Sequence, residues 1–213
     1  MPVRGLEEDQ DVAALHEEAL AWLGGGVGWL DVHTHIGRND PDGLQAETHE
    51  LLEALDRAGQ HEACVFPMHE PDGYRAANDA VLAAALGSGG RLLSLARVAP
   101  DPPGAAAELE RCLDAGARGL KLHPRSDDFR MDHPAIEPLV AQVAARRGVV
   151  LIHAGRGIPE LGEHAAELAA AHPHARLVLA HAGISDLGLL ADAAAAMPNL
   201  LFDTSWWQPA DLL

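Results

Sequence analysis

Two histidines stand two residues apart in the largely apolar segment Trp29-Leu-Asp-Val-His33-Thr-His35-Ile36. Alternate side chains of a β-strand point the same way, so a strand here turns both imidazoles to one face. Two neutral imidazoles on one face can bind a divalent cation if further ligands complete the site. The alternative is a chance pair on an edge strand or a pH-sensitive surface patch. The segment therefore predicts a metal centre whose other ligands lie elsewhere in the chain.

Three later segments are also short apolar runs that end in an ionisable residue just before a turn. They are Gly119-Leu-Lys-Leu-His-Pro124, Val149-Val-Leu-Ile-His-Ala-Gly155 and Arg176-Leu-Val-Leu-Ala-His-Ala-Gly183. If the runs are parallel strands of one barrel, their carboxyl ends meet at one mouth. We expect the four segments to contribute to a single site.

Composition limits what kind of protein holds such a site. A chain of 213 residues that is 48% hydrophobic can bury the core of one domain. Its formal net charge of −17 opposes binding to nucleic acid and to anionic membranes. An acidic N-terminus lacks the features of a secretory signal, and Cys64 and Cys112 are expected to be reduced core residues. We expect a cytoplasmic protein that acts on a small molecule, without a nucleic-acid or membrane partner.

Apolar runs and amphipathic stretches alternate about every 28 residues. An amphipathic helix over 12–23 and a glycine-rich turn are expected to form an N-terminal segment, residues 1–28, ahead of a domain over 29–213. The expected strands are 29–36, 62–68, 92–98, 119–123, 149–154, 176–181 and 199–204. The expected helices are 45–58, 75–86, 104–115, 134–146, 160–171 and 186–196.

This alternation predicts an α/β fold with a parallel sheet covered by helices. An open doubly wound sheet would spread the ionisable strand ends over a wide crevice, whereas a closed barrel gathers them at its mouth. We therefore expect a (β/α)8 TIM-barrel type, and only seven strands can be counted. Such a domain typically needs about 250 residues, so the barrel is expected to be incomplete after the seventh strand. Open sheet edges would then favour homo-oligomers or aggregation.

The order and spacing of these blocks, together with Leu201-Phe-Asp-Thr-Ser205, resemble the metal-dependent amidohydrolase superfamily, specifically its amidohydrolase-related (type 2) branch, over residues 29–207. The resemblance implies that His33, His35 and His153 hold a divalent metal. It implies that His181 is catalytic, either orienting and deprotonating the attacking water or binding a second metal. It also implies a metal-binding Asp on an eighth strand, which this chain does not reach.

Imidazole ligands suit zinc, although iron, manganese or cobalt would also accept them. A metal-bound hydroxide would then attack a carbonyl group of an amide, a lactone or a similar small organic substrate. The same branch includes non-oxidative decarboxylases of aromatic and unsaturated acids, so a C–C lyase is an alternative. A further alternative is an inactive or fragmentary metal-binding barrel that lacks the strand-eight Asp.

Other residues at the strand ends are expected to contact the substrate: Lys121, His123, Arg97, His69 and Asp203. Lys121 is the only lysine of the chain. It is either a cation for the substrate, a carboxylated bridge between two metals as in some members of the superfamily, or a buried structural charge. The planar guanidinium of Arg97 suits a substrate carboxylate.

Overall fold

The computed structural model describes residues 28–40, 43–101, 103–158, 160–184 and 186–207, with six further residues between 14 and 22. Half of the predicted helix over 12–23, and all of the glycine-rich turn except Gly28, lie outside the described residues. The boundary between an N-terminal segment and a barrel domain therefore stays a prediction.

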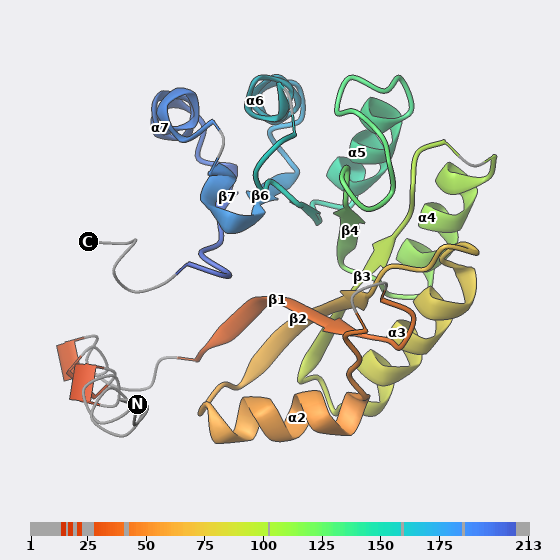
Figure 1. Cartoon of the computed structure of the whole chain (residues 1–213), viewed down its shortest axis with the longest axis vertical. Helices are drawn as coiled ribbons and strands as arrows, with labels where there is room; N and C mark the ends of the chain where they lie inside the picture. The colour runs from red at the N-terminus through yellow and green to blue at the C-terminus, as the bar shows by residue number, and fades with distance from the viewer. Residues whose placement is uncertain are drawn as a thin grey trace.

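Seven strands form one parallel sheet in the order of the sequence. The strands are β1 (Leu30–Ile36), β2 (Glu62–Pro67), β3 (Leu92–Arg97), β4 (Gly119–Leu122), β5 (Val149–Ile152), β6 (Arg176–Leu179) and β7 (Leu200–Phe202). The sheet curls so that β1 and β7 form its two edges, which do not pair with each other in the described part of the chain (Figure 1). This is the predicted TIM-barrel type with seven strands.

Helices connect the strands and cover the outer side of the curved sheet (Figure 1). They are α2 (Thr48–Arg57), α3 (Arg75–Gly87), α4 (Ala105–Asp114), α5 (Ile136–Ala145), α6 (Leu161–Ala171) and α7 (Leu187–Ala196). Each lies within one or two residues of its predicted range, except that α2 starts three residues late. No described helix is long and apolar enough to cross a lipid bilayer.

Strand alternation divides the core into an outer layer and an inner layer. On β5, Val150 and Ile152 pack outward against the helices, whereas Leu151 packs inward with Phe66. The same period continues past the end of the strand, so that His153 joins the inward row. The ends of the inward rows therefore supply the side chains at the mouth of the curled sheet.

The sixth predicted strand ends two residues early. After Leu179 the chain turns into a short 3-10 segment, η1 (Ala180–Gly183), in which His181 and Ala182 have left-handed backbone angles, with φ of 56° and 54°. Gly183 follows with φ of 60°. Left-handed conformations are costly for residues other than glycine, so the surrounding contacts must stabilise this turn.

Candidate active site

The two histidines of β1 lie on the inner side of the sheet, as the alternation predicted. The imidazole of His33 lies 5.3 Å from the ring of Phe66, and that of His35 lies 4.3 Å from it, measured between ring centroids. The two imidazoles are 5.4 Å apart. They share this face even though the pairing of β1 with β2 shifts register between Asp31 and Thr34.

Asp203, which follows β7, connects His33 to the turn at His181. His33 Nδ1 lies 2.8 Å from Asp203 Oδ2, and because a carboxylate can only accept, the imidazole donates. The other carboxylate oxygen accepts the backbone N–H of His181 at 3.1 Å and that of Ser205 at 3.0 Å. Burial alone would raise the pKa of Asp203, but the hydrogen bonds from His33 and Ser205 outweigh it and hold this pKa below its usual range.

A chain of hydrogen bonds fixes the tautomers of His181 and His153. His181 Nδ1 donates to the carbonyl oxygen of Ser205 at 2.9 Å, which leaves Nε2 of the neutral ring as an acceptor. His153 Nδ1 lies 3.1 Å from that nitrogen and is therefore the donor. His153 Nε2 is then unprotonated, and it is buried without a hydrogen-bond partner among the described residues.

In three imidazoles Nδ1 thus carries the proton, and Nε2 is left unprotonated. His33 and His153 donate through Nδ1 as described, and His35 Nδ1 faces the carbonyl oxygen of Pro67 at 3.4 Å. Burial lowers the pKa of all three rings, and in His153 it does so to about 3 with the help of the Lys121 ammonium. Neutral imidazole is the form that ligates metals, so the chemistry of this donor set fits a divalent cation.

The imidazole nitrogens have the right chemistry for a metal site, but they lie too far apart to form one. No three histidine, cysteine, aspartate or glutamate side chains in the described ranges are already close enough to hold a metal ion. Metal binding therefore requires these imidazoles to move closer together. The lack of a side chain at Gly155 makes room for the His153 ring, because a Cβ at position 155 would lie 2.7 Å from His153 Nε2.

Lys121 lies beneath this cluster on β4, with no exposed surface. Its Nζ has no hydrogen-bond partner among the described residues and lies 4.8 Å from the centre of the Phe66 ring. Burial, followed by the positive charge of Arg97, lowers the pKa of Lys121 to about 7. The amine can therefore be neutral near physiological pH, but no part of it is exposed to a substrate here.

His123 differs from the other imidazoles in its tautomer. Its Nδ1 accepts the backbone N–H of Ser126 at 3.1 Å, so the proton of the neutral ring is on Nε2. The ring stacks on His153 at 3.9 Å between centroids, and burial lowers its pKa. His123 thus offers a hydrogen-bond donor beside the ring that offers an acceptor.

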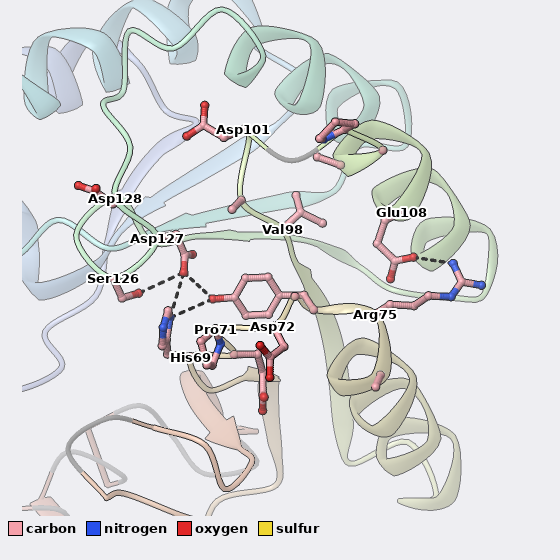
Figure 2. Close-up of a pocket in the computed structure, with 18 residues that line it drawn as sticks. His69, Pro71, Asp72, Arg75, Val98, Asp101, Glu108, Ser126, Asp127 and Asp128 are labelled. Atoms are coloured by element: carbon pink, nitrogen blue, oxygen red, sulfur yellow. Dashed lines mark hydrogen bonds and ion pairs between the residues drawn. The ribbon is translucent and has the colours of Figure 1, made fainter.

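Arg97 and His69 belong to a second cluster, centred on Asp127 in the loop after β4. The Arg97 guanidinium binds Asp127 through Nε at 3.2 Å and through Nη2 at 3.0 Å, and both side chains are 2% exposed. His69 Nδ1 lies 3.2 Å from the same carboxylate, and the Tyr74 hydroxyl also donates to it. Figure 2 shows His69 and Ser126 converging on Asp127. The carboxylate that Arg97 binds therefore belongs to Asp127 of the protein and not to a substrate.

Two cavities open at this end of the sheet. The larger, about 990 Å³, lies over the loops after β2, β3 and β4, and its walls include His69 and Asp127 (Figure 2). The smaller, about 490 Å³, contains His153 and His181. Its remaining walls are Arg125, Gly155, Arg156, Ile184, Trp206 and Trp207. The smaller cavity is the candidate substrate site because His153, a predicted metal ligand, and His181, the predicted catalytic residue, line it. His69, a predicted substrate contact, lines the larger cavity instead.

Several residues of this site were not predicted from the sequence. Arg125 and Arg156 each follow a predicted strand end by two residues, and their position just after the His-Pro and His-Ala-Gly blocks was a usable signal. Asp127 and Ser205 act through contacts with residues distant in the sequence. No local pattern pointed to Asp127, and Ser205 stood only as the last residue of the Leu201–Ser205 block.

A protein-family model described as amidohydrolase matches residues 30–212. No curated protein matches the chain. Among solved structures, an uncharacterised TIM-barrel protein, Bb4693, from Bordetella bronchiseptica superposes with a TM-score of 0.67 at 16% identity, over 84% of this chain and 75% of that one. A probable 2-pyrone-4,6-dicarboxylic acid hydrolase from Acinetobacter baumannii gives 0.63 at 16% identity, over 87% and 75%. A dihydroxybenzoic acid decarboxylase from Polaromonas sp. JS666, solved with bound manganese, gives 0.56 at 18% identity, over 73% and 66%. At these identities the likeness establishes the barrel fold.

Proposed function

Because the chain belongs to the amidohydrolase family, we propose that it is a metal-dependent hydrolase. Its reacting group would be the carbonyl of an amide, a lactone or a similar group, in a small substrate that also carries a free carboxylate. The observation that supports the metal is the set of tautomers. His33 and His153 commit their Nδ1 protons to the protein and keep Nε2 unprotonated, and His35 is arranged in the same way. These three residues would hold the cation.

Members of the family use a divalent metal ion. Such an ion would supply Lewis acidity, which polarises a carbonyl group and makes water more acidic. We propose zinc, because imidazole ligands suit it, and the manganese of the Polaromonas decarboxylase makes manganese the main competitor.

His181 is the proposed general base. The carbonyl oxygen of Ser205 holds its Nδ1 proton, so Nε2 is the nitrogen that can accept a proton from water. In the structure this nitrogen accepts a hydrogen bond from His153 Nδ1, so it can accept a proton from water only while that bond is open. His123, with its proton on Nε2, is the proposed donor to the oxygen that gains negative charge.

The walls of the smaller cavity support an acidic, planar substrate. Arg125 and Arg156 line it, and neither makes an ion pair with another described residue. Their guanidinium groups can bind a carboxylate in two-point geometry, while Trp206 and Trp207 provide flat apolar surface. We therefore assign carboxylate recognition to these arginines in place of Arg97.

A decarboxylase of an aromatic or unsaturated acid is the second candidate. The same two arginines and the same histidines would orient an acid for loss of carbon dioxide, and a decarboxylase is among the structural neighbours. The two reactions share the cation and the carboxylate, so only product analysis separates them.

The first test is the metal content of the purified chain, measured by plasma mass spectrometry. We expect about one equivalent in the parent, loss in a His33→Ala/His35→Ala double variant, and retention in a His49→Ala/His172→Ala variant that removes two imidazoles elsewhere. A folded parent that binds no zinc, manganese, iron or cobalt would overturn the proposal.

The metal-loaded protein is then screened with lactones and amides of small carboxylic acids, followed by aromatic acids with detection of carbon dioxide. For any substrate found, Arg125→Gln and Arg156→Gln should raise KM for the acid and leave KM for its methyl ester unchanged. Equal effects on acid and ester would contradict the assigned carboxylate subsite.

A further inference from the structure

We propose that Asp203 is a positioning residue that fixes the tautomer of His33 and the backbone of His181, and that it does not contact the substrate. The inference rests on the proposed function only in that it takes His33 and His181 as working residues of the site. It replaces the substrate-binding role that the sequence suggested for this aspartate.

Both oxygens of Asp203 are already engaged. Oδ2 accepts from His33 Nδ1 at 2.8 Å. Oδ1 accepts the backbone N–H of His181, the backbone N–H of Ser205 and the Ser205 hydroxyl. The side chain is 5% exposed and does not line the smaller cavity. One oxygen is filled by three donors, the other is bound to His33, and the carboxylate has no opening to the smaller cavity through which a substrate could reach it.

The backbone of Asp203 also stabilises the left-handed turn at His181 and Ala182. Its carbonyl oxygen accepts the N–H of Ala182 at 2.7 Å, and its own N–H donates to the carbonyl oxygen of Leu179 at 3.1 Å. Two consecutive N–H groups of η1 are therefore bound by one residue. This residue stabilises backbone angles that His181 and Ala182 would rarely adopt alone.

The same carboxylate connects the two edges of the sheet. β1 and β7 do not pair within the described residues, yet His33 of β1 reaches Asp203, immediately after β7, through their side chains. The bond therefore sets the distance between the predicted metal ligand on one edge and the predicted base beside the other.

Oδ1 of Asp203 accepts from three donors and Oδ2 accepts from His33, so the substitution Asp203→Asn tests the inference. Three donors point at the Oδ1 position, so the amide oxygen must occupy it. The amide NH2 must then occupy the Oδ2 position and donate to His33 Nδ1. His33 then favours the tautomer with its proton on Nε2, the nitrogen that a metal requires to be unprotonated, because an Nδ1 proton would point at the amide NH2.

The measurement is a long-range proton–nitrogen correlation spectrum of the histidine rings in metal-free, nitrogen-15-labelled protein, with the His33 signal assigned by its loss in His33→Gln. We expect the wild-type ring to be protonated on Nδ1 and the Asp203→Asn ring on Nε2. Zinc affinity, measured by competition with a chelating dye, should fall roughly 10- to 100-fold in Asp203→Asn. Asp186→Asn is the control, because Asp186 also accepts a backbone N–H, from Gly162, but contacts no imidazole among the described residues.

A wild-type His33 protonated on Nε2 overturns the inference, even if Asp203→Asn fails to fold. So does an Asp203→Asn protein in which the proton stays on Nδ1 and zinc affinity changes less than twofold. If instead KM for a substrate rises while tautomer and zinc affinity are unchanged, Asp203 is a substrate contact. Because the tautomer is read without metal, a protein that shows the expected tautomer but binds no metal refutes the proposed function alone.

Discussion

Replacing Asp127 with asparagine should destabilise the fold severely, because it leaves the buried guanidinium of Arg97 without its counter-charge. Both side chains are 2% exposed, and the guanidinium makes two-point contact with the carboxylate. Removing one partner of such a pair typically costs about 3–5 kcal/mol. For a domain of this size each kcal/mol lowers Tm by roughly 2–4 °C, so we expect a decrease of about 6–20 °C.

The assay is urea and thermal unfolding followed by circular dichroism, with a double-mutant cycle. Arg97→Met alone should also be destabilising, but Arg97→Met/Asp127→Asn should lose less than the sum of the single variants, by about 2 kcal/mol or more. Asp114→Asn is the matched control: this aspartate pairs with Arg146 at the surface, and its loss should cost roughly 0.5 kcal/mol or less.

Two results would refute this reasoning. Asp127→Asn with stability within about 1 kcal/mol of the parent would mean that the pair is not desolvated as its burial implies. Arg97→Met with unchanged stability and a raised KM for an acidic substrate would return Arg97 to the substrate-binding role suggested by its position on β3.

Three further predictions follow from single groups. Gly155→Ala should weaken zinc binding at least tenfold, because the added Cβ displaces His153. The control is Gly188→Ala, where an added Cβ meets no atom within 4 Å, and it should keep the zinc affinity and unfold no more easily than the parent. Equal zinc affinities of the two variants in a dye-competition assay would contradict the predicted steric clash. An arginine guanidinium lowers the pKa of Glu108 from 4.5 to about 2, so its stabilisation is present above pH 4.5 and is lost as pH falls toward 2. Glu108→Gln should then cost about 1 kcal/mol at pH 7 and almost nothing at pH 2, and a pH-independent difference in urea unfolding would refute this. Because the folded pKa of Lys121 lies near 7, below its ordinary 10.5, this lysine destabilises the fold increasingly as pH falls toward 7. Lys121→Met should therefore be stabilising, by about 2 kcal/mol more at pH 6 than at pH 9, and a gain that is larger at pH 9 would count against it.

The fold was predictable because continuous apolar runs and amphipathic stretches alternate along the whole chain. All seven strands and six helices lie at their predicted places, with strand ends shortened by up to two residues. The early end of β6 was not predictable from the pattern. Apolar periodicity says nothing about the left-handed angles of His181, which depend on hydrogen bonds from beyond β7.

The site was predictable to the extent that strand alternation decides which side chains point inward. Which inward side chains pair was not, because pairing depends on how loops fold over the mouth. Asp127 lies 30 residues after Arg97 and is brought to it by the loop after β4. Likewise, inward alternation identified Asp203 as a residue of the mouth but could not show that His33 and His181 occupy both of its oxygens.

The left-handed turn at residues 181–183 also bears on how this chain can change under selection. Each left-handed residue other than glycine costs roughly 1–2 kcal/mol, and Ala182 has a side chain too small to repay that cost by packing. A library selected only for heat resistance would therefore enrich glycine at position 182. The same substitution would loosen the backbone that presents His181, so thermostable variants recovered this way should have lost turnover. Selection for stability and selection for catalysis conflict at this single alanine.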